Sequence, residues 1–390
     1  MKCVTILLAT LSPLLMASSC GSGSSTTGGG ETVSTPSPTS TTAGFDGNFA
    51  VSEHGSFDEP WAAAFVPGTD VIVVTEKGGS IRGMNTANQR AIFFTGVPQV
   101  DYGGQGGLGD IAFLPSEASS TIDRRTIYLS WAEAGSGDTR GAVVGRGQMV
   151  CEDHQSCEIR NMEVIWRQAP KTTGRGHYSH RILFSPDERY MYVASGDRQK
   201  LDPAQDRSNT LGSIVRLNLD GSAAADNPFG DEIWSYGHRN ILGMDFDAQG
   251  RLWDMEHGPK GGDELNLVKR GANYGWPVRS NGVHYNGDNI PDHSADDGFA
   301  KPAISWTPVI APGNMVFYRG SLFDGMKGDA LISGLSSNAI VRVAIDGESA
   351  IEVARYDMGK RIRSVIEGPD GALWVLEDGS GGRLLELRPQ

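Results

Sequence analysis

The sequence predicts an all-β protein, and more specifically a six-bladed β-propeller with four-stranded antiparallel blades. The chain has 390 residues, of which 52 are Gly and only 21% are charged. Short apolar runs alternate with glycine-containing turns, which is typical of strands joined by hairpins. The apolar residues nowhere keep the 3.6-residue spacing of a helix over more than about 12 residues.

A loose phrase that recurs along the chain predicts the number of blades. Each copy joins one apolar run, through a turn that contains Pro, Asp or Gly, to a second apolar run. The turns lie near positions 67, 115, 186, 248, 325 and 369. Four-stranded units at such a period are the signature of a propeller. An array of β-sandwiches is the competing architecture, but it would not require the same phrase in every unit.

The N-terminal segment predicts export. Residues 1–19 combine Lys2, an apolar stretch and small residues, which is the pattern of a signal peptide. The small residues before Cys20 are typical of a bacterial lipoprotein signal, after which Cys20 is acylated; the alternative is an ordinary secretory signal. Residues 20–44 comprise this Cys and a flexible Gly/Ser/Thr/Pro tether. The propeller domain is expected over residues 45–390, so the membrane is a partner only through the lipid anchor, in the periplasm or cell envelope.

Charge and cysteine content narrow the class further. The formal net charge of −13, without a basic stripe, argues against nucleic acid as a partner. Two cysteines remain in the expected domain, Cys151 and Cys157, and they enclose a short hydrophilic loop. In an exported protein this spacing predicts a disulfide. The alternative is a metal site formed by both cysteines with His154.

Residues 233–276 carry the densest group of candidate site residues. Two apolar runs, 241–246 and 251–255, predict neighbouring strands joined at 248–250. Polar groups follow where these strands end, in the segments 238–240, 256–259 and 263–264. Arg, Asn and carboxylate side chains at strand ends favour a rim that holds a polar ligand and a hard cation. The alternative is a set of solvated turns and structural ion pairs.

Three further segments add candidates. The glycine-dense loop 102–110 brings Gln105 close to a flat ligand, unless it is simply a flexible surface loop. His177 and His180 precede an expected strand, and a histidine at a ligand site is the natural general base. Arg361 and Arg363 point to one face of an extended segment and form a two-pronged grip on carboxylates, unless they belong to a solvated edge.

Together these motifs resemble the soluble aldose sugar dehydrogenases, the six-bladed quinoprotein family that includes soluble glucose dehydrogenase. The resemblance runs from about Phe57 to the C-terminus. It rests on the following segments, in this order: 104–108 (GQGGL), 177–181 (HYSHR), 211–221 (LGSIVRLNLDG), 237–240 (GHRN), 256–259 (EHGP), 262–266 (GDELN), 273–277 (NYGWP) and 361–363 (RIR).

This resemblance implies a cofactor, a metal and a reaction. The family binds pyrroloquinoline quinone (PQQ) and Ca²⁺, and it oxidises the anomeric carbon of aldose sugars to lactones. His177 matches the general base. The positions that match cofactor-binding residues are Gln105, Arg239, Asn240, Tyr285, Arg361 and Arg363. The carbonyls of Gly258 and Pro259 match ligands of the cofactor's calcium, whereas Glu264 and the carbonyl of Tyr274 match a second calcium site, with Asp263 adjacent.

The residue types suit this chemistry, with two departures. PQQ carries three carboxylates, which arginines bind well, and Ca²⁺ takes oxygen ligands. The family usually has small residues where this chain has Ser179 and His180, so His180 is expected to narrow the site or to shift the pKa of His177. A cofactor-binding Lys of some members is replaced by Ser336 or Ser337. The competing functions are a non-enzymatic ligand-binding propeller and a calcium-dependent lactonase; the electron acceptor and oligomeric state are not specified by the sequence.

Overall fold

The computed structural model describes residues 45–153 and 155–390, so the expected signal peptide, Cys20 and the tether before residue 45 lie outside the described residues. The regular secondary structure of the described part is strand, apart from two short 3₁₀ helices, η1 (Pro115–Glu117) and η2 (Asp202–Gln205). The predicted all-β class is therefore confirmed. Within these ranges, no helix has the length and apolarity needed to cross a bilayer.

Three sheets in the second half of the chain each contain four antiparallel strands. The first consists of β10 (Ser179–Phe184), β11 (Tyr190–Ser195), β12 (Ser213–Asn218) and β13 (Ile233–Tyr236). The second consists of β14 (Ile241–Phe246), β15 (Leu252–Glu256), β17 (Asp263–Leu267) and β19 (Ile304–Trp306). The third consists of β20 (Pro312–Phe317), β21 (Ala330–Gly334), β22 (Ala339–Asp346) and β23 (Ser349–Asp357). A small ladder, β16 (Lys260–Gly261) with β18 (Gly282–Val283), lies apart from them.

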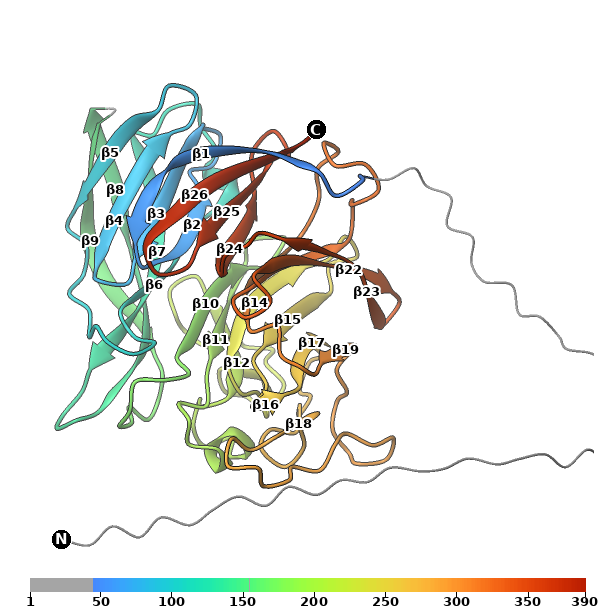
Figure 1. The fold of residues 1–390 in the computed structure, drawn as a ribbon. Helices are drawn as coiled ribbons and strands as arrows, with labels where there is room; N and C mark the ends of the chain where they lie inside the picture. Colours follow the sequence, from blue (N-terminus) through green and yellow to red (C-terminus); the bar gives the residue numbers. More distant parts are fainter. Residues whose placement is uncertain (1–44, 154) are drawn as a thin grey trace, which may run out of the picture. The chain divides into compact units, whose positions relative to one another are not determined.

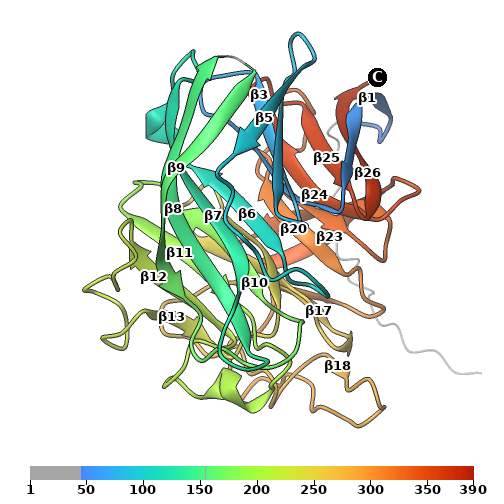
Figure 2. The same cartoon turned by 90° about the vertical axis from the view of Figure 1, so that its left-hand side faces the viewer.

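An eight-stranded sheet in the first half of the chain is built from two antiparallel runs. One run is β2 (Pro60–Phe65), β3 (Val71–Glu76), β4 (Ser80–Asn85) and β5 (Arg90–Thr95). The other is β6 (Leu108–Phe113), β7 (Arg124–Ala134), β8 (Arg140–Asp153) and β9 (Ser156–Arg167). The last strands of the two runs, β5 and β9, pair in parallel and join the runs at their outer edges (Figure 2).

The last sheet brings the two ends of the described chain together. It contains β24 (Ile362–Glu367), β25 (Leu373–Glu377), β26 (Ser380–Pro389) and, beside β26, β1 (Phe49–Asp58) (Figure 1). The first strands of successive runs contact one another in the order β2, β6, β10, β14, β20, β24, and β24 contacts β2. The strands nearest the centre therefore form a closed ring, as they do in a β-propeller.

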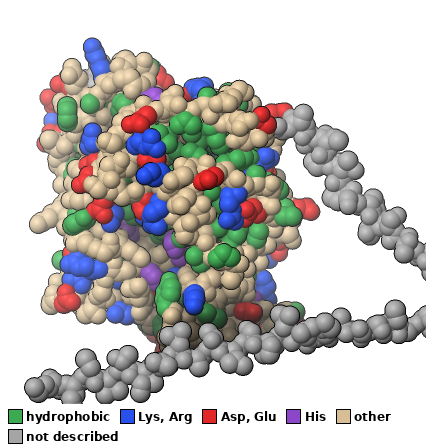
Figure 3. Space-filling model, viewed as in Figure 1, with side chains coloured by type: hydrophobic (Ala, Val, Ile, Leu, Met, Phe, Trp, Pro, Cys, Tyr) green, Lys and Arg blue, Asp and Glu red, His purple; other side chains and the backbone are tan. Residues whose placement is uncertain are grey.

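Apolar side chains fill the space between neighbouring sheets. Between the sheet that begins with β14 and the sheet that begins with β20, for example, Trp253 and Met255 pack with Met315 and Phe317. The turns expected near positions 67, 115, 186, 248, 325 and 369 all connect the first two strands of a run. The recurring phrase thus marks the innermost hairpin of each run, because that hairpin is covered on both sides and must be apolar. On the face in Figure 3, acidic and basic side chains are interspersed over the surface.

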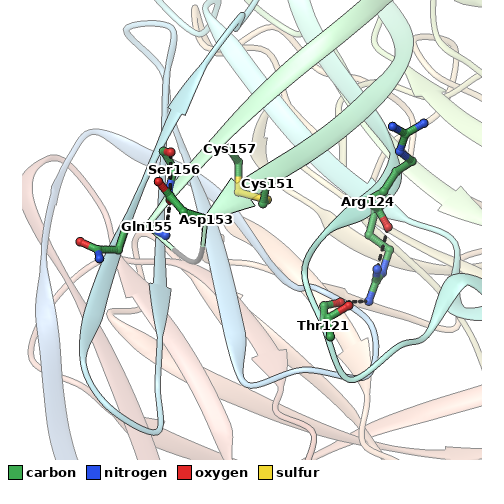
Figure 4. Close-up of a disulfide and its surroundings, with 8 residues drawn as sticks. Thr121, Arg124, Cys151, Asp153, Gln155, Ser156 and Cys157 are labelled. Atoms are coloured by element: carbon green, nitrogen blue, oxygen red, sulfur yellow. Dashed lines mark hydrogen bonds between the residues drawn. A yellow bond between two sulfur atoms is a disulfide. The ribbon is translucent and has the colours of Figure 1, made fainter.

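The predicted disulfide is confirmed, and it joins β8 to β9 (Figure 4). Cys151 and Cys157 are both buried in the apolar cluster beneath this hairpin. Asp153 supports the turn, because its Oδ1 accepts hydrogen bonds from the backbone N–H groups of Gln155 and Ser156 at 2.8 and 2.6 Å. The alternative metal site is wrong for this structure, since both sulfur atoms are consumed by the disulfide and offer no thiolate ligand.

Candidate active site

His177 is held in one orientation by a buried carboxylate. It precedes β10 in a left-handed backbone conformation (φ +49°), and it is 5% exposed. Its Nδ1 lies 2.6 Å from Oδ1 of Asp197, which follows β11. Oδ2 of Asp197 accepts a second hydrogen bond, from Nε1 of Trp276 at 2.8 Å. Because an ionised carboxylate only accepts hydrogen bonds, Nδ1 carries the proton and Nε2 keeps its lone pair.

The electrostatics of this pair favour a neutral imidazole beside a charged carboxylate. Burial lowers the pKa of His177 below its ordinary value, and the contact with Asp197 opposes this effect without cancelling it. For Asp197 burial acts in the opposite direction, but the hydrogen bond from His177 and the charge of Arg239 outweigh it, so that the pKa of Asp197 is lowered. His177 is therefore ready to accept a proton at neutral pH.

Gln105 joins the glycine-dense loop to this histidine. Its Oε1 accepts a hydrogen bond from the backbone N–H of His177 at 2.6 Å, and its own N–H binds the carbonyl of Arg175. The glycines of the loop serve the packing of the backbone itself. A Cβ on Gly104 would lie 2.6 Å from the Arg175 oxygen, and one on Gly107 would lie 2.2 Å from the Lys77 oxygen. The loop is thus a tightly packed support that presents Gln105, rather than a free surface loop.

A cavity of about 230 Å³ lies beside this loop. Four of the residues that the motifs predict for cofactor binding line it: Gln105, Asn240, Arg361 and Arg363. They come from three distant parts of the chain, which the closed ring of strands brings together. The motifs did not predict several other lining residues, among them Trp61, Lys77, Tyr178 and His257. Trp61 and Lys77 flank one copy of the recurring phrase, and the sequence gives no sign that they have a role in the site.

Arg361 and Arg363 do point to one side, as their spacing predicts. Both bind the carboxylate of Asp378: Nε of Arg361 lies 2.9 Å from Oδ2, and Nη2 of Arg363 lies 2.6 Å from Oδ1. Burial alone would raise the pKa of Asp378, but the two guanidinium groups lower it. Two cations share one anion here, so this wall of the cavity keeps an excess of positive charge.

Arg239 does not line the large cavity, but it contacts His257, which does. Its Nη1 donates to the His257 carbonyl at 3.0 Å, and its Nη2 lies 3.4 Å from the hydroxyl of Tyr285. Its Nε is buried without a hydrogen-bond partner. Tyr285 itself is 73% exposed, so it covers the guanidinium from the solvent side. The pKa of His257 is lowered to about 3. Burial is the largest cause, and the nearby Arg239, His177 and Arg363 also lower it.

The residues predicted to bind calcium gather around a second, small cavity. Gly258, Glu264 and Tyr274 line it together with Arg239 and His257, and its volume of about 10 Å³ is the size of one water molecule or ion. His257 lines both cavities, so they adjoin. Pro259 is next to Gly258 in the chain but is not part of the lining. Residues that the motifs predict for two separate cation positions, Gly258 for one and Glu264 and Tyr274 for the other, thus line the same small cavity.

Two buried carboxylates, Glu256 and Glu264, line this small cavity together with the guanidinium groups of Arg239 and Arg279. Burial, followed by the nearby Glu256, raises the pKa of Glu264 well above its ordinary value. Asp263 has a structural role, because its two oxygens accept the N–H groups of Gly258 and Ala311 at 2.9 and 2.7 Å. Burial also raises the pKa of Asp263, to about 6. A cation beside these groups would relieve the cost of burying them.

His180, at a position where the family usually has a small residue, packs in the wall of the large cavity. Its ring stacks on Trp61 at a centroid distance of 4.8 Å, and its Nδ1 lies 2.8 Å from the hydroxyl of Ser130. Burial lowers the pKa of His180 to about 3, so it is neutral. It lines the large cavity, as a narrowing residue should, but it is not among the groups that shift the pKa of His177.

A buried group near the small cavity was not predicted. His238 lies with its Nδ1 3.4 Å from Asp254 and 3.2 Å from Glu256, and the three side chains bring their ligand atoms within 4.8 Å of one another. The side-chain amide of Asn266 donates to both carboxylates, at 3.2 and 3.1 Å. These hydrogen bonds satisfy most of the polar side-chain atoms in the cluster. The cluster therefore stabilises the neighbouring ends of strands β15 and β17.

The comparisons with known proteins agree with this geometry. Residues 57–386 match the family model of glucose and sorbosone dehydrogenases. The chain belongs to the glucose/sorbosone dehydrogenase family. Aldose sugar dehydrogenase YliI of Escherichia coli is 36% identical over 344 residues, which cover 85% of this chain and 91% of that protein. Quinoprotein glucose dehydrogenase B of Acinetobacter calcoaceticus is 24% identical, with 84% of each chain covered.

Solved structures of this family share the fold. The apo form of the soluble aldose sugar dehydrogenase of Escherichia coli has a TM-score of 0.81 and 35% identity, and the match covers 88% of this chain and 100% of that one. The PQQ-bound form of an aldose sugar dehydrogenase from Streptomyces coelicolor has a TM-score of 0.71 and 25% identity, with 88% and 99% covered. The resemblance stated from the motifs is therefore confirmed at the level of the family.

Proposed function

We propose that this member of the family is a sugar dehydrogenase that uses PQQ and Ca²⁺ to oxidise the anomeric carbon of aldoses to lactones. The observation that carries the proposal is the buried His177–Asp197 pair. The backbone N–H of His177 donates to Gln105, which lines a cavity together with the guanidinium groups of Arg361 and Arg363. We further infer that the six antiparallel runs of four strands are the six blades of a propeller. The ring of contacts between their first strands supports this arrangement.

The residues present suit a planar tricarboxylate such as PQQ. Arg361 and Arg363 share the single carboxylate of Asp378, so they can still attract an anion. The buried Nε of Arg239 lacks a partner and can donate to one. Lys77 adds a further cation to the lining, although it also pairs with Glu59 at 3.2 Å. Gln105 and Asn240 supply neutral hydrogen-bonding groups, and Tyr285 covers Arg239.

Glu256 and Glu264 in the lining of the small cavity offer oxygen ligands to a cation. We propose that the carbonyls of Gly258 and Pro259 face the cofactor's Ca²⁺ and that Glu264, with the carbonyl of Tyr274, holds a second ion. Asp263 supports the first position, because it fixes the N–H of Gly258 and thereby the orientation of that peptide. Oxygen atoms of carbonyls and carboxylates are the ligands that Ca²⁺ prefers.

The reaction then follows from the state of His177. PQQ, when bound, supplies the acceptor for the hydride of the anomeric carbon. Nε2 of His177 takes the proton of the anomeric hydroxyl, while the C–H electron pair leaves with the hydride and the C–O bond becomes the carbonyl of the lactone. Asp197 keeps the imidazole in the required tautomer and stabilises its protonated form. The burial of the pair excludes water that would compete for the proton.

A reconstitution experiment tests this function. The purified chain, loaded with PQQ and Ca²⁺, is expected to reduce an artificial dye when glucose or another aldose is added. His177→Asn should lower turnover by about 10²–10⁴-fold, while PQQ binding, followed by tryptophan fluorescence, persists. Binding of PQQ with no turnover on any aldose would favour a non-enzymatic propeller, and hydrolysis of a lactone without PQQ would favour a lactonase. A panel of sugars and acceptors then identifies the substrate and the electron acceptor.

We also propose that the protein is exported. A signal peptide over residues 1–19, an acylated Cys20 and a tether that ends at residue 44 would place the enzyme in the periplasm or cell envelope. The disulfide at Cys151 and Cys157 supports an oxidising compartment. Labelling with a radioactive fatty acid, in the natural chain and in Cys20→Ser, tests the lipid anchor directly.

A further inference from the structure

The segment that carries His177 has an unfavourable backbone conformation. His177, Ser179 and His180 all have a positive φ, at +49°, +59° and +49°. Residues other than glycine adopt this left-handed conformation at an energetic cost, and it persists only where the surrounding structure holds it. The contacts that hold the segment therefore also fix the position of the imidazole.

Arg198, which follows β11, binds this segment through its guanidinium group and its backbone. Its Nη1 donates to the carbonyl of Gly176 and its Nη2 to the carbonyl of Gly174, both at 2.7 Å. Its Cζ lies 3.7 Å from the centre of the Tyr178 ring. The backbone N–H of Arg198 also donates to the His177 carbonyl, at 3.3 Å. One guanidinium group thus contacts the chain on both sides of His177.

Arg198 and its neighbour Asp197 hold His177 in complementary ways. Asp197 fixes the imidazole ring through Nδ1, at 2.6 Å, whereas Arg198 fixes the backbone from which the ring projects. The backbone N–H of Gln199 donates to Oδ1 of the same carboxylate at 2.9 Å, which supports the turn that presents both side chains. The ring and the backbone of His177 are therefore held from one short turn after β11.

Packing alone does not account for a guanidinium group at this position. Arg198 is 1% exposed, and its Nε has no hydrogen-bond partner. Among the residues that the structure describes, no Asp or Glu forms an ion pair with it; its guanidinium binds the two carbonyls instead. A buried charge without an ionic partner is costly, and the unbranched apolar side chain of a Met would fill similar space without that cost. Beyond packing, Arg198 provides the hydrogen bonds next to His177 and a positive charge.

We propose that Arg198 is a positioning residue for the base, which holds the chain on both sides of His177 and keeps Nε2 of the imidazole directed at the substrate. It does not line the large cavity, so it acts through His177 and not on the cofactor or the sugar. A displacement of about 1 Å can lower the rate of a reaction about 100-fold, so the loss of such a clamp affects kcat. The inference rests on the proposed role of His177 in sugar oxidation.

The charge of Arg198 gives this role an electrostatic readout. Burial is the largest cause that lowers the pKa of His177, and the charges of Arg239 and Arg198 lower it further, whereas Asp197 raises it. The ionisable groups that face His177 or Arg198 from the surrounding segments are Asp197, Arg239, His257, Tyr178, His180 and Arg140. Removal of the guanidinium should therefore raise the pKa of His177. Looser packing would also raise it, so a variant that keeps the charge is needed.

The titration of His177 is measured on the full chain without PQQ. In protein labelled with ¹⁵N in its histidines, the NMR shifts of Nδ1 and Nε2 report the pKa and the tautomer, and His177→Asn identifies the resonances. Arg198→Met removes the charge and is expected to raise the pKa above that of the natural chain. Arg198→Lys keeps the charge and should leave the pKa close to the natural value. An equal rise in both variants would show that the charge has no part in the effect and would overturn the electrostatic argument.

The clamp is measured by kinetics on the PQQ-loaded protein. Both variants lose the two-pronged contact, because a lysine amine lacks the planar fork of a guanidinium. We expect kcat to fall by about 10- to 100-fold in Arg198→Met and by less in Arg198→Lys. The dissociation constant of PQQ should stay unchanged in both, since Arg198 does not line the cavity. A natural kcat in both variants would overturn the proposal.

Arg125→Met is the matched control. Arg125 is a second buried arginine that donates to backbone carbonyls, those of Pro67, Ser119 and Thr121, and it lies at the start of β7 without a contact to the His177 segment. Its removal should lower the melting temperature but leave kcat and the pKa of His177 unchanged. An effect on kcat as large as that of Arg198→Met would overturn the proposal.

Two outcomes need separate treatment. If the melting temperature shows that Arg198→Met does not fold, Arg198→Lys decides alone, and a natural kcat in that variant would refute the clamp. If the natural chain binds PQQ but oxidises no aldose, the proposed function fails, whereas the NMR titration still tests Arg198. An unchanged pKa of His177 in Arg198→Met would then overturn the inference by itself.

Discussion

Nδ1 of His177 lies 2.6 Å from Oδ1 of Asp197, and both side chains are buried. This contact assigns the proton to Nδ1 and the lone pair to Nε2, which is the arrangement that a general base requires. We therefore expect His177→Asn to lower kcat by about 10²–10⁴-fold, the usual contribution of general-base catalysis. Asp197→Asn should also lower kcat strongly, because an amide can present a donor to Nδ1 and stabilise the wrong tautomer.

The control for these variants is PQQ binding. Neither side chain carries a positive charge that the cofactor's carboxylates need, so the dissociation constant of PQQ should change little. Steady-state kinetics give kcat, and fluorescence titration gives the PQQ affinity. A large loss of PQQ affinity in both variants, with kcat preserved at saturation, would contradict the assignment of a base.

The pH profile should show the effect of burial on His177. The base acts when it is neutral, so activity should rise with pH through the pKa of His177. Burial lowers that pKa below the ordinary 6.5, and the midpoint of the acid limb of kcat/KM is therefore expected below pH 6.5. Asp197 opposes the lowering, so Asp197→Asn should move the midpoint to still lower pH. A midpoint above 6.5 in the natural chain would contradict this reasoning.

Arg363 should matter more than Arg361 for cofactor affinity. Both line the cavity, but the side chain of Arg363 is 13% exposed and that of Arg361 is 53% exposed, so water screens Arg361 more. A hydrogen bond to a charged group contributes about 1.5–3 kcal/mol, which predicts a loss of PQQ affinity of roughly 10- to 150-fold in Arg363→Ala. The loss in Arg361→Ala should be smaller.

Arg355→Ala is the matched control for both arginine variants. Arg355 lies on β23 in the neighbouring sheet and pairs with Glu352 at the surface. Its removal should leave PQQ affinity as it is in the natural chain. Fluorescence titration of the three variants under one buffer condition ranks them. The expected order would be wrong if Arg361→Ala lost more affinity than Arg363→Ala.

The sequence predicts the fold better than it predicts the contacts inside the site. The recurring phrase located the innermost hairpins because alternating apolar runs and turns are local properties. The pairing of His177 with Asp197 spans 20 residues, and that of Asp197 with Trp276 spans 79. The first contact depends on the pairing of β10 with β11, and the second joins the end of β11 to the loop that follows β17.

The glycine-dense loop has a further role in the structure that its sequence does not indicate. Gly104 and Gly107 were expected to let the backbone approach a ligand, but the Arg175 and Lys77 backbones fill the space beside them. These close contacts fix the loop, and Gly104 and Gln105 both line the large cavity. A sequence shows that glycine is needed at a close approach, but the partner in that approach depends on the tertiary structure.

Removal of cations should destabilise the protein more as the pH rises. Burial and the neighbouring Glu256 raise the pKa of Glu264 well above its usual range, and burial raises that of Asp263 to about 6. The metal-free native state therefore holds protons that the unfolded chain releases near pH 4, and its stability falls as pH rises through the raised values. A bound cation takes the place of these protons. The stabilisation by cations should thus be small at pH 5 and large at pH 8.

Differential scanning calorimetry with Ca²⁺ or EDTA, at pH 5 and pH 8, measures this difference in melting temperature. Glu264→Gln provides the comparison, since an amide remains neutral at both pH values. In this variant the melting temperature should depend less on pH in EDTA and respond less to Ca²⁺. If the natural chain instead lost equal stability in EDTA at both pH values, the raised pKa of Glu264 would not be linked to a cation. The carboxylate would then be kept protonated by its surroundings alone.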